Sequence, residues 1–467
     1  MTERGRDLVI VGAGPAGLSA AISARALGLD TLILDEQPSA GGQIYRNVQR
    51  VAERRPADLA FLGDDYARGG ALVRKAVDIE RRQGATVWHI GPMSGAEGRQ
   101  VVWSEQGRAR RVKTRAVLLA TGAMERPVPI PGWTLPGVTT VGALQTVLKQ
   151  AAVYPEGRVV LAGSGPLLML LAAQYAGAGV QVDAILDTAP PGTMGKALPR
   201  LPLAALGAWR TILKGLKLRN AYGRGAREVW TGVTDIRAEG EDALQRVRFT
   251  DSSGRVREIE AATLALHEGV IPNAQLARLV GARHLWDDRQ RCFRPVLDAF
   301  GASDAQGVFV AGDGGGILGA VSAELSGRVA AVAIAHALGI IVESERDLRT
   351  AADLDRLTGQ RWLRLFLDAM FPPPDWIGRM ADDATVCRCE EVRAADLRRV
   401  APHAQGPNQL KAYTRAGMGP CQGRMCGNTV TEVLAEARGS TPGAVGYYRI
   451  RPPVKPVTIE ELAALAD

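Results

Sequence analysis

The chain has 467 residues, enough for about three domains. Apolar residues make up 46% and charged residues 23% of the sequence, a balance that excludes extensive disorder. The 57 Lys and Arg exceed the 49 Asp and Glu by a net charge of +8 without forming a basic run, which does not support nucleic-acid binding. The sequence offers no apolar signal segment and no apolar stretch of transmembrane length, from which we expect a cytoplasmic protein.

Two segments share one layout and predict two nucleotide-binding units. Residues 8–36 and 159–187 each contain an apolar run, a Gly-rich turn, a helical stretch rich in Ala and Leu, and a second apolar run. Continuous apolar strands are typical of a parallel sheet buried on both faces. Three further apolar runs end in small residues, as at a ligand crevice, over 116–123, 263–269 and 308–314. The sequence therefore predicts an α/β fold with two Rossmann-like domains.

The first turn carries a complete dinucleotide fingerprint. Gly12-x-Gly14-x-x-Gly17 follows a strand and opens a helix, with Pro15 and Ala16 in the first helical positions. The first Gly permits the tight turn, the second lets the backbone approach a pyrophosphate, and the third permits close helix–strand packing. The helix N-terminus then presents N–H groups to the phosphates.

An acidic residue follows at the expected distance. Asp35 ends the second strand, where its carboxylate can accept hydrogen bonds from ribose hydroxyls, and Glu36 is the neighbouring candidate. The motif by itself does not distinguish NAD from FAD. A tight turn without a ligand is the alternative interpretation.

The second turn is incomplete. Gly163 and Gly165 are present, but the third position is Leu168. Alignment with the first unit places Leu186 at the position of Asp35, with Asp187 next in the chain. A large third residue is expected to move the helix away from the strand or to change how a pyrophosphate lies.

Four of the five cysteines lie within one short segment. Because the chain has so few cysteines, four thiolates in one segment predict a metal or cluster site. They belong to Cys387, Cys389, Cys421 and Cys426. Structural zinc and a [2Fe–2S] cluster both take four Cys, and this spacing is typical of neither a zinc ribbon nor a plant ferredoxin. Cys292 stands alone and is expected to be an inert core residue. Because no Cys pair precedes it, disulfide reduction is excluded.

A helix and several basic residues accompany the cysteines. Residues 427–437 predict a helix that starts at Cys426, so its positive end would stabilise an anionic cluster. Four basic residues would favour the reduced cluster or simply form a solvated surface, namely Arg388, Lys411, Arg415 and Arg424.

Several motifs together resemble the two-dinucleotide flavoproteins, the family of glutathione-reductase-like and thioredoxin-reductase-like enzymes. They are VIVGAGPAGLSAA, LDEQPSAGGQ, ATGA at 120–123 and GVFVAGD at 307–313. The resemblance implies that the first unit binds FAD and the second NAD(P)H. It implies flavin contacts along a second set of turns, at Gly41, Gly42, Gln43, Thr121, Gly122, Gly312 and Asp313. The alternative to flavin contacts is that the glycines only form turns and that Asp313 caps a helix. At Gly163 and Gly165 a bound NAD(P), ADP or ATP and an empty site all stay open.

The segments CRCEEV and LKAYTRAGMGPCQGRMCGNTVTEVL resemble the bacterioferritin-associated-ferredoxin (BFD) type of [2Fe–2S] domain. This resemblance implies that Cys387, Cys389, Cys421 and Cys426 are the cluster ligands. The chain departs from the commonest form of that domain, which ends CxxC, because it ends CxxxxC. The longer form is associated with amino-acid dehydrogenase subunits.

With these resemblances the chain divides into five parts. We predict an FAD domain over 1–135 and 275–342, a second nucleotide domain over 136–274, a helical linker over 343–379, a small, mainly helical [2Fe–2S] domain over 380–440, and an extended tail over 441–467 that packs on the body.

The whole chain is similar to the large subunit of hetero-oligomeric, dye-linked amino- and imino-acid dehydrogenases. That group includes hydrogen cyanide synthase, octopine and nopaline oxidases, and proline and D-hydroxyproline dehydrogenases, and the nucleotide half also resembles sarcosine oxidase α. The resemblance implies an electron-transfer subunit, with the C–N bond of a substrate such as an opine, proline, D-hydroxyproline or glycine oxidised on an FAD-dependent β subunit of the sarcosine or D-amino-acid oxidase type. The same resemblance implies a small ferredoxin-like γ subunit, an FMN at a subunit interface and a peripheral link to the respiratory chain.

Two other classes stay open. A self-contained NAD(P)H-dependent, ferredoxin-type reductase is favoured by Gly163 and Gly165 and disfavoured by Leu168 and Leu186. A non-catalytic iron–sulfur sensor or scaffold is disfavoured by the intact first turn. His267 and Glu268 end a strand and are the best local acid–base pair, but a packed strand end explains them equally, so we assign no catalytic residue.

Overall fold

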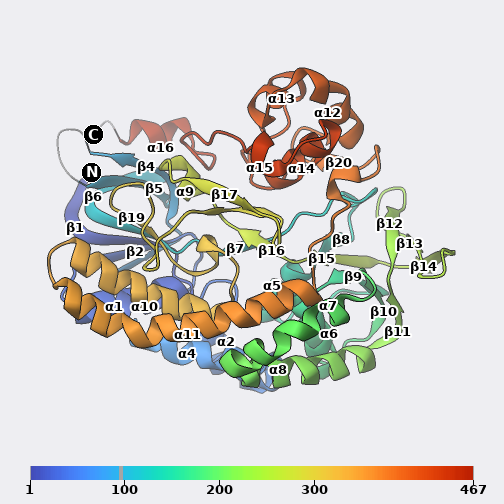
Figure 1. Ribbon diagram of the computed structural model, residues 1–467, viewed down its shortest axis with the longest axis horizontal. Coiled ribbons are helices and arrows are strands. Elements are labelled where there is room, and N and C mark those ends of the chain that lie inside the picture. Colours follow the sequence, from blue (N-terminus) through green and yellow to red (C-terminus); the bar gives the residue numbers. More distant parts are fainter. Residues whose placement is uncertain (1, 94–97, 466–467) are drawn as a thin grey trace.

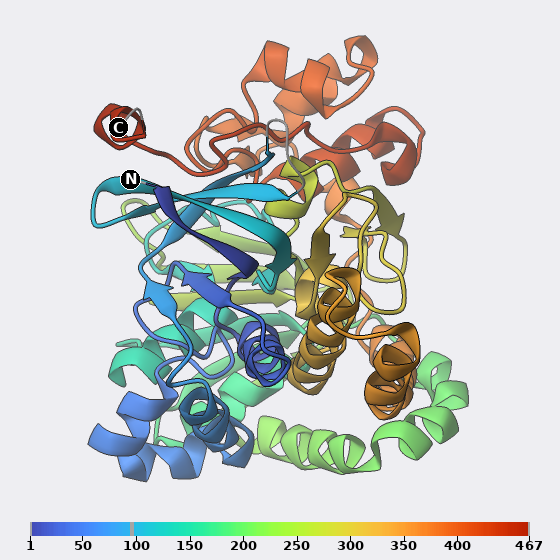
Figure 2. The ribbon, with the colours of Figure 1, turned by 90° about the vertical axis from the view of Figure 1, so that its left-hand side faces the viewer.

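The computed structural model describes residues 2–93 and 98–465 and arranges them as two α/β units beside each other, with a small helical unit above them (Figures 1 and 2). The first unit is built on a seven-stranded mixed sheet of order β3-β2-β1-β6-β5-β4, in which β19 pairs with the second half of β6. Its strands are β1 (Thr2–Val11), β2 (Thr31–Asp35), β3 (Arg81–Gln83), β4 (Thr86–Pro92), β5 (Arg99–Glu105), β6 (Arg108–Leu119) and β19 (Val308–Val310).

The central strand β1 buries both of its faces. Leu8 and Ile10 contribute to the core beneath the helices, whereas Val9 and Val11 contribute to a second core on the other side of the sheet. This alternation follows from the two-residue repeat of a strand. The helices of this unit are α1 (Pro15–Ala26), α2 (Val48–Arg54), η1 (Pro56–Asp58), α3 (Leu59–Leu62), α4 (Asp64–Lys75), α9 (Gln275–Leu279), η3 (Gly312–Gly315) and α10 (Ala320–Ala337).

The second unit is built on a five-stranded parallel sheet of order β11-β10-β9-β15-β8, with a separate antiparallel sheet β12-β13-β14. The strands are β8 (Val138–Thr140), β9 (Val159–Ser164), β10 (Val182–Asp187), β11 (Ala226–Thr231), β12 (Thr234–Glu239), β13 (Arg246–Thr250), β14 (Val256–Glu260) and β15 (Thr263–Glu268). The helices are α5 (Val141–Ala151), α6 (Pro166–Gly177), α7 (Thr193–Ala197), η2 (Leu198–Arg200) and α8 (Leu201–Arg224).

Two short antiparallel strands carry the chain between the units. We refer to β7 (Ala123–Glu125) and β16 (Val270–Pro272) as the crossing strands. The hairpin of β17 (His284–Asp287) and β18 (Cys292–Pro295) lies beside them. The long helix α11 (Glu343–Met370) then runs along both units, and it passes α8 so closely that a Cβ on Gly207 would lie 2.5 Å from the Cα of Gly359. It ends just before the prolines at 372–374, which cannot continue a helix.

The C-terminal unit has a core of its own. Val430, Val433, Leu434, Leu397 and Leu410 pack together with essentially no exposure. The elements are η4 (Ile377–Arg379), β20 (Thr385–Cys387), β21 (Val392–Arg393), α12 (Ala394–Val400), η5 (Ala401–His403), α13 (Pro407–Thr414), α14 (Gly427–Ala437) and α15 (Pro442–Val445).

The last segment returns to the first unit. The backbone N–H of Val454 donates to the carbonyl oxygen of Trp88 at 3.0 Å, and the Val454 side chain enters the second core of the first sheet. The segment is less extended than the sequence suggests, because it contains α15 and α16 (Ile459–Ala463), and residues 466–467 lie outside the described residues. Within the described ranges, no helix combines the length and the apolar character that crossing a membrane would require.

Buried charges attach the C-terminal unit to the crossing strands. Arg126 follows β7, its side chain is 2% exposed, and it donates to the backbone carbonyls of Glu268, Gln290 and Arg291. The Glu432 carboxylate on α14 lies 4.0 Å from the Arg126 guanidinium and accepts from the Arg291 side chain at 3.0 Å. These contacts fix α14 against both β7 and the β17–β18 hairpin.

We expect Glu432→Ala to destabilise this attachment by about 3–5 kcal/mol, because it leaves the buried Arg126 without a carboxylate. Equilibrium unfolding in urea and protease sensitivity around residues 371–380 measure the effect. Glu436→Ala is the matched control on the same helix, since the Glu436 side chain is half exposed and lies 3.7 Å from Arg379. It should cost less than about 1 kcal/mol. Equal effects of the two substitutions would contradict the assignment.

Candidate cofactor sites

The first Gly-rich turn lies where three backbone segments meet. A Cβ on Gly12 would lie 2.4 Å from the carbonyl oxygen of Ala120, and one on Gly17 would lie 1.9 Å from the carbonyl oxygen of Gly12. A Cβ on Gly42 would lie 2.9 Å from the Cα of Gly14. Because no side chain fits at these contacts, the turn after β1, the end of β6 and the loop at 41–43 must approach backbone to backbone. A nucleotide-binding turn requires such a close backbone approach without intervening side chains.

The remaining predicted residues converge on the same place. A Cβ on Gly314 would lie 3.3 Å from the Thr121 hydroxyl and 3.5 Å from the Gly122 carbonyl oxygen, and one on Gly312 would lie 2.9 Å from the Ala16 Cβ. Asp313 uses one carboxylate oxygen, Oδ1, to accept the backbone N–H groups of Leu318 and Gly319 at 2.9 and 2.8 Å. It therefore shapes the loop before α10 and does not act as the N-cap residue, which is Gly319.

The two acidic candidates have different environments. Asp35 is 7% exposed and accepts the backbone N–H groups of Ala13 and Gln37. Burial raises the pKa of Asp35, and these two donors oppose the shift. Glu36 is exposed and pairs with Lys455 from the C-terminal segment. Asp35 thus lies against the first turn, whereas Glu36 attaches the tail.

A lysine from the second unit supports the loop at 41–43. Lys149 on α5 is 3% exposed, and its ammonium donates to the carbonyl oxygens of Gln43 and Ile44 at 3.3 and 3.2 Å. Burial, together with the charge of Arg46, lowers the pKa of Lys149 to about 7. The Gln43 side chain accepts from Arg46 at 2.9 Å. Lys149 could not be predicted from the sequence, since a single Lys in an amphipathic helix gives no signal.

The structure corrects the alignment of the second turn. Val11 pairs with Leu34 in the first sheet, which places Asp35 opposite Gly12, and Asp187 pairs with Gly163 in the second sheet. Asp187 is therefore the equivalent of Asp35, and the assignment of Leu186 to that position is wrong by one residue. The cause is one extra residue between the glycine and the end of the second strand.

Asp187 also repeats the local role of Asp35. Its carboxylate accepts the backbone N–H of Ala189, two residues on, at 2.9 Å. Leu168 lies in the hydrophobic core beneath α6, 1% exposed, and Gly163 approaches β15 so closely that a Cβ would lie 1.8 Å from the His267 carbonyl oxygen. The second turn thus keeps its strand packing and its acidic residue, although its helix starts with a bulky side chain.

His267 and Glu268 are buried in a network between the units. The His267 Nδ1 lies 2.5 Å from a carboxylate oxygen of Glu125, whose other oxygen accepts the backbone N–H of Gly142 at 2.8 Å. Glu268 accepts from the Thr188 hydroxyl at 2.6 Å, and burial raises the pKa of Glu268 to about 7. These bonds tie the end of β15 to β7 and α5, which is the role of a packed strand end.

The four clustered cysteines lie as two pairs. The thiols of Cys387 and Cys426 are hydrogen-bonded to each other, as are those of Cys389 and Cys421. Cys387 also accepts the backbone N–H of Gly417 at 3.4 Å, and these hydrogen bonds lower the pKa of Cys387 to about 6. In the described part of the chain, no three His, Cys, Asp or Glu side chains gather around one point suited to a single ion. Four thiols in two pairs match the donor set of a [2Fe–2S] cluster.

Two tyrosines close over the cysteine loop. A Cβ on Gly423 would lie 2.7 Å from the Tyr448 ring, and one on Gly427 would lie 2.3 Å from the Tyr447 hydroxyl. The Tyr448 hydroxyl donates to the carbonyl oxygen of Ala416 at 2.7 Å. The sequence analysis assigned these residues to the tail and did not connect them with the cysteines, because no spacing rule links them.

The basic residues near the cysteines are partly engaged elsewhere. Arg415 pairs with Glu390 at 2.7 Å, which offsets its charge, and Lys411 lies over the Tyr448 ring, 5.5 Å from its centroid. The helix that begins after Cys426 is α14, as the sequence predicts. Its N-terminal N–H groups are the closer source of positive potential for a cluster.

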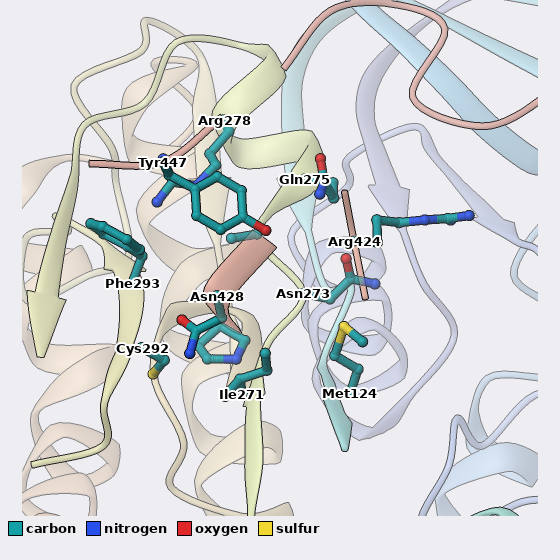
Figure 3. Close-up of a pocket in the computed structure, with 12 residues that line it drawn as sticks. Met124, Ile271, Asn273, Gln275, Arg278, Cys292, Phe293, Arg424, Asn428 and Tyr447 are labelled. Atoms are coloured by element: carbon teal, nitrogen blue, oxygen red, sulfur yellow. The ribbon is translucent and has the colours of Figure 1, made fainter. Parts of the chain in front are cut away.

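A cavity separates the cysteine unit from the crossing strands (Figure 3). Met124 and Ile271 line it from the crossing strands, and Asn428 and Arg424 line it from the cysteine unit. Asn273 reaches both regions, because its backbone N–H donates to the Gly122 carbonyl at 2.9 Å and its carbonyl accepts from the Thr121 hydroxyl at 3.0 Å. Asn273 therefore links the Thr121–Gly122 turn to the wall of this cavity, which the cysteine unit also lines.

An arginine and a cysteine complete the wall of this cavity. The Arg278 guanidinium lies between two rings, 4.7 Å from the Phe293 centroid and 4.2 Å from the Tyr447 centroid. Cys292 is 1% exposed, and burial raises the pKa of Cys292 to about 12. A thiol with such a pKa is inert at neutral pH.

Comparison with known proteins identifies both parts. Residues 6–198 match the pyridine nucleotide-disulphide oxidoreductase family, and residues 385–436 match the BFD-like [2Fe-2S] binding domain. The chain is 44% identical to the A subunit of opine oxidase from Agrobacterium tumefaciens (strain Ach5), over 98% of this chain and 92% of that protein. The chain belongs to the family of opine oxidase A subunits. It is also 34% identical to hydrogen cyanide synthase subunit HcnB of Pseudomonas aeruginosa, over 96% of each chain.

A solved structure with the same fold covers the entire chain. L-proline dehydrogenase from P. horikoshii superposes with a TM-score of 0.72 at 18% identity, over 99% of this chain and 80% of that one. The predicted α/β fold with a small C-terminal [2Fe–2S] domain is thus confirmed. Membership in the family makes the chain an oxidoreductase subunit, its first domain implies FAD, and its cysteine domain implies a [2Fe–2S] cluster.

We expect Gly17→Ala to weaken flavin retention. Overpacking costs about 1–3 kcal/mol, which corresponds to about 5- to 150-fold weaker FAD binding. The flavin-to-protein absorbance ratio after gel filtration measures the effect. Gly215→Ala is the matched control, because a Cβ there meets nothing within 4 Å, and it should retain the flavin. Full flavin occupancy in the Gly17 variant would contradict this assignment of the site.

We expect Cys421→Ala to remove the cluster, because one iron then lacks a thiolate. Anaerobic iron and sulfide analysis and the visible spectrum measure the loss. Cys292→Ala should keep the same iron content, since Cys292 lies outside both thiol pairs. A zinc content equal to one per chain, without sulfide, would contradict the [2Fe–2S] assignment.

Proposed function

We propose that the chain is the electron-transfer subunit of a hetero-oligomeric dehydrogenase that oxidises a C–N bond of an opine. The match to the A subunit of opine oxidase supports the opine class over proline, D-hydroxyproline or glycine, because it reaches 44% identity over nearly the whole chain. In this proposal the substrate is oxidised on a partner subunit, which is an FAD-dependent β subunit. Two-electron flavin chemistry and one-electron cluster chemistry are what the bound groups supply.

The residues proposed to hold FAD surround the first turn. They are Gly12, Gly14, Pro15, Ala16, Gly17, Asp35, Glu36, Gly41, Gly42, Gln43, Thr121, Gly122, Gly312 and Asp313. Their close backbone approaches support the proposal. The pairing of Glu36 with Lys455 gives that residue an indirect part, because it attaches the tail beside Asp35. We propose that the cluster lies between the two cysteine pairs. For the domains we propose the bounds that the sequence predicts.

The observation that carries the electron-transfer proposal is the position of Asn273. This residue holds the Thr121–Gly122 turn with two hydrogen bonds and also lines the cavity against Arg424 and Asn428. Arg424 and Asn428 flank Cys426 in the chain. The proposed flavin turn and the proposed cluster loop are therefore separated by one shared wall, and the buried Arg126–Glu432 contact holds that wall in place.

Further partners belong to the proposal. An adenine nucleotide, as NAD(P), ADP or ATP, would bind at Gly163 and Gly165. The proposal also includes a small ferredoxin-like γ subunit and an FMN at a subunit interface. It places the complex in the cytoplasm, with a peripheral link to the respiratory chain.

A second candidate function gains support from the corrected register. If Asp187 meets a ribose as Asp35 does, the second site favours an unphosphorylated 2′-hydroxyl, hence NADH over NADPH. The chain would then be a self-contained NADH-dependent reductase of a ferredoxin-type acceptor.

Spectra of the purified protein separate the two functions. We expect octopine or nopaline to bleach the flavin and cluster bands of the complex isolated anaerobically from its native host, and to leave the separated chain unchanged. Prolines and glycine serve as substrate controls. Rapid bleaching of the separated chain by NADH, but not by opines in the complex, would overturn the relay function in favour of the reductase.

A further inference from the structure

Helix α8 presents its large apolar side chains to solvent. Five large apolar residues are each more than half exposed, in a row that comprises Leu203 and Leu206 before the kink at Ala208, and Trp209, Leu213 and Leu216 after it. Leu198, just before the helix, is 56% exposed and extends the row. Contiguous apolar patches of this kind mark interaction surfaces.

The inner face of the same helix carries small residues at its closest contact with α11, and Leu201 and Ile212 pack beside them. Ala204 and Ala208 are buried, and Gly207 touches Gly359 of α11 backbone to backbone. A helix that only closed the core of the unit would place its leucines inward. In α8 the close contact with α11 is made by small side chains, which turns the large ones outward.

The chain segment that contains this row is basic. Residues 188–227 contain no Asp or Glu and eight basic residues, namely Lys196, Arg200, Arg210, Lys214, Lys217, Arg219, Arg224 and Arg227. Lys214 pairs with Asp65 of α4 and Arg227 with Asp183 of β10. In the remainder of the chain 49 basic residues stand against all 49 acidic ones, so the formal net charge of +8 equals the charge of this one segment.

We propose that α8 is a docking surface for an anionic lipid bilayer, with the helix lying in the plane of the membrane. A row of Leu and Trp flanked by Lys and Arg is the chemistry that inserts into the headgroup region and meets acidic lipids. A protein partner is the alternative occupant, which the experiment below distinguishes from a bilayer. This surface goes beyond the proposed function and does not depend on it.

The position of α8 in the molecule is compatible with docking. In both views α8 lies along the edge of the molecule farthest from the C-terminal unit of α12–α15 (Figures 1 and 2). A bilayer against α8 would therefore leave the cysteine unit and the cavity beside it facing away from the lipid and accessible to another protein.

Vesicle sedimentation tests the surface with the full-length holoprotein. We expect binding to vesicles of equal parts phosphatidylglycerol and phosphatidylcholine, weak binding to pure phosphatidylcholine, and release by salt. Leu206→Ser/Leu213→Ser should weaken binding by about tenfold or more, since exposed leucines contribute directly to apolar burial. Lys217→Glu should weaken it by at least about fivefold, because roughly 1 kcal/mol is lost with one basic residue near an acidic surface and the new carboxylate adds repulsion.

The matched control is Leu348→Ser/Ile459→Ser, which removes two leucine-sized side chains that are 81% and 87% exposed elsewhere on the surface. It should bind vesicles like the unchanged protein, and all variants should keep the same visible spectrum and thermal midpoint. Absent binding to acidic vesicles, or equal loss in the control, would overturn the proposal. Unchanged vesicle binding of the α8 variants combined with loss of the flavoprotein partner would overturn it as well, because α8 would then be a subunit interface.

Discussion

The arrangement of the whole molecule depends on one buried arginine. Arg126 lies at the point where the chain leaves the first unit, and its guanidinium satisfies backbone carbonyls at the end of β15 and before β18 while it faces Glu432 of α14. A buried guanidinium is tolerated only with such complete pairing. Since its partners come from three separate parts of the chain, the units can pack in one relative position. The cavity between the crossing strands and the cysteine unit is a consequence of that position.

Both predicted cofactor regions depend on glycines, which have no side chain and therefore permit close contacts. In the first turn, glycine carries the contacts between the end of β1, the end of β6 and the loop at 41–43. In the cysteine unit the glycines admit side chains rather than backbone, because Gly423 and Gly427 make room for the rings of Tyr447 and Tyr448. A loop that must hold a cluster needs both a small backbone and an apolar cover that limits access of water.

The sequence was informative where a signal is local. The glycine spacing, the apolar strands and the grouping of four cysteines each lie within a few dozen residues, and the fold and the family follow from them. The pairing of Asp187 with Gly163 could not be predicted, because one additional residue in a turn changes strand register without changing the pattern. Lys149, and the pairing of Lys455 with Glu36, were missed for another reason. Each connects segments more than a hundred residues apart, and a lone lysine carries no pattern of its own.

Charge has two separate roles in this molecule, and burial decides between them. The charges that fix the units are few and nearly inaccessible, so removing one partner leaves an uncompensated ion and a cost of about 3–5 kcal/mol. The basic residues of 188–227 are in the opposite regime. Most of them lie on the surface, where a single pair contributes about 0–1 kcal/mol at most, so individually they add little to folding. Their common sign acts only collectively, toward an extended acidic partner, and the leucines between them contribute apolar area that the fold itself leaves exposed. A surface of this kind does nothing for the stability of the free chain, which is the physical reason to assign it to binding.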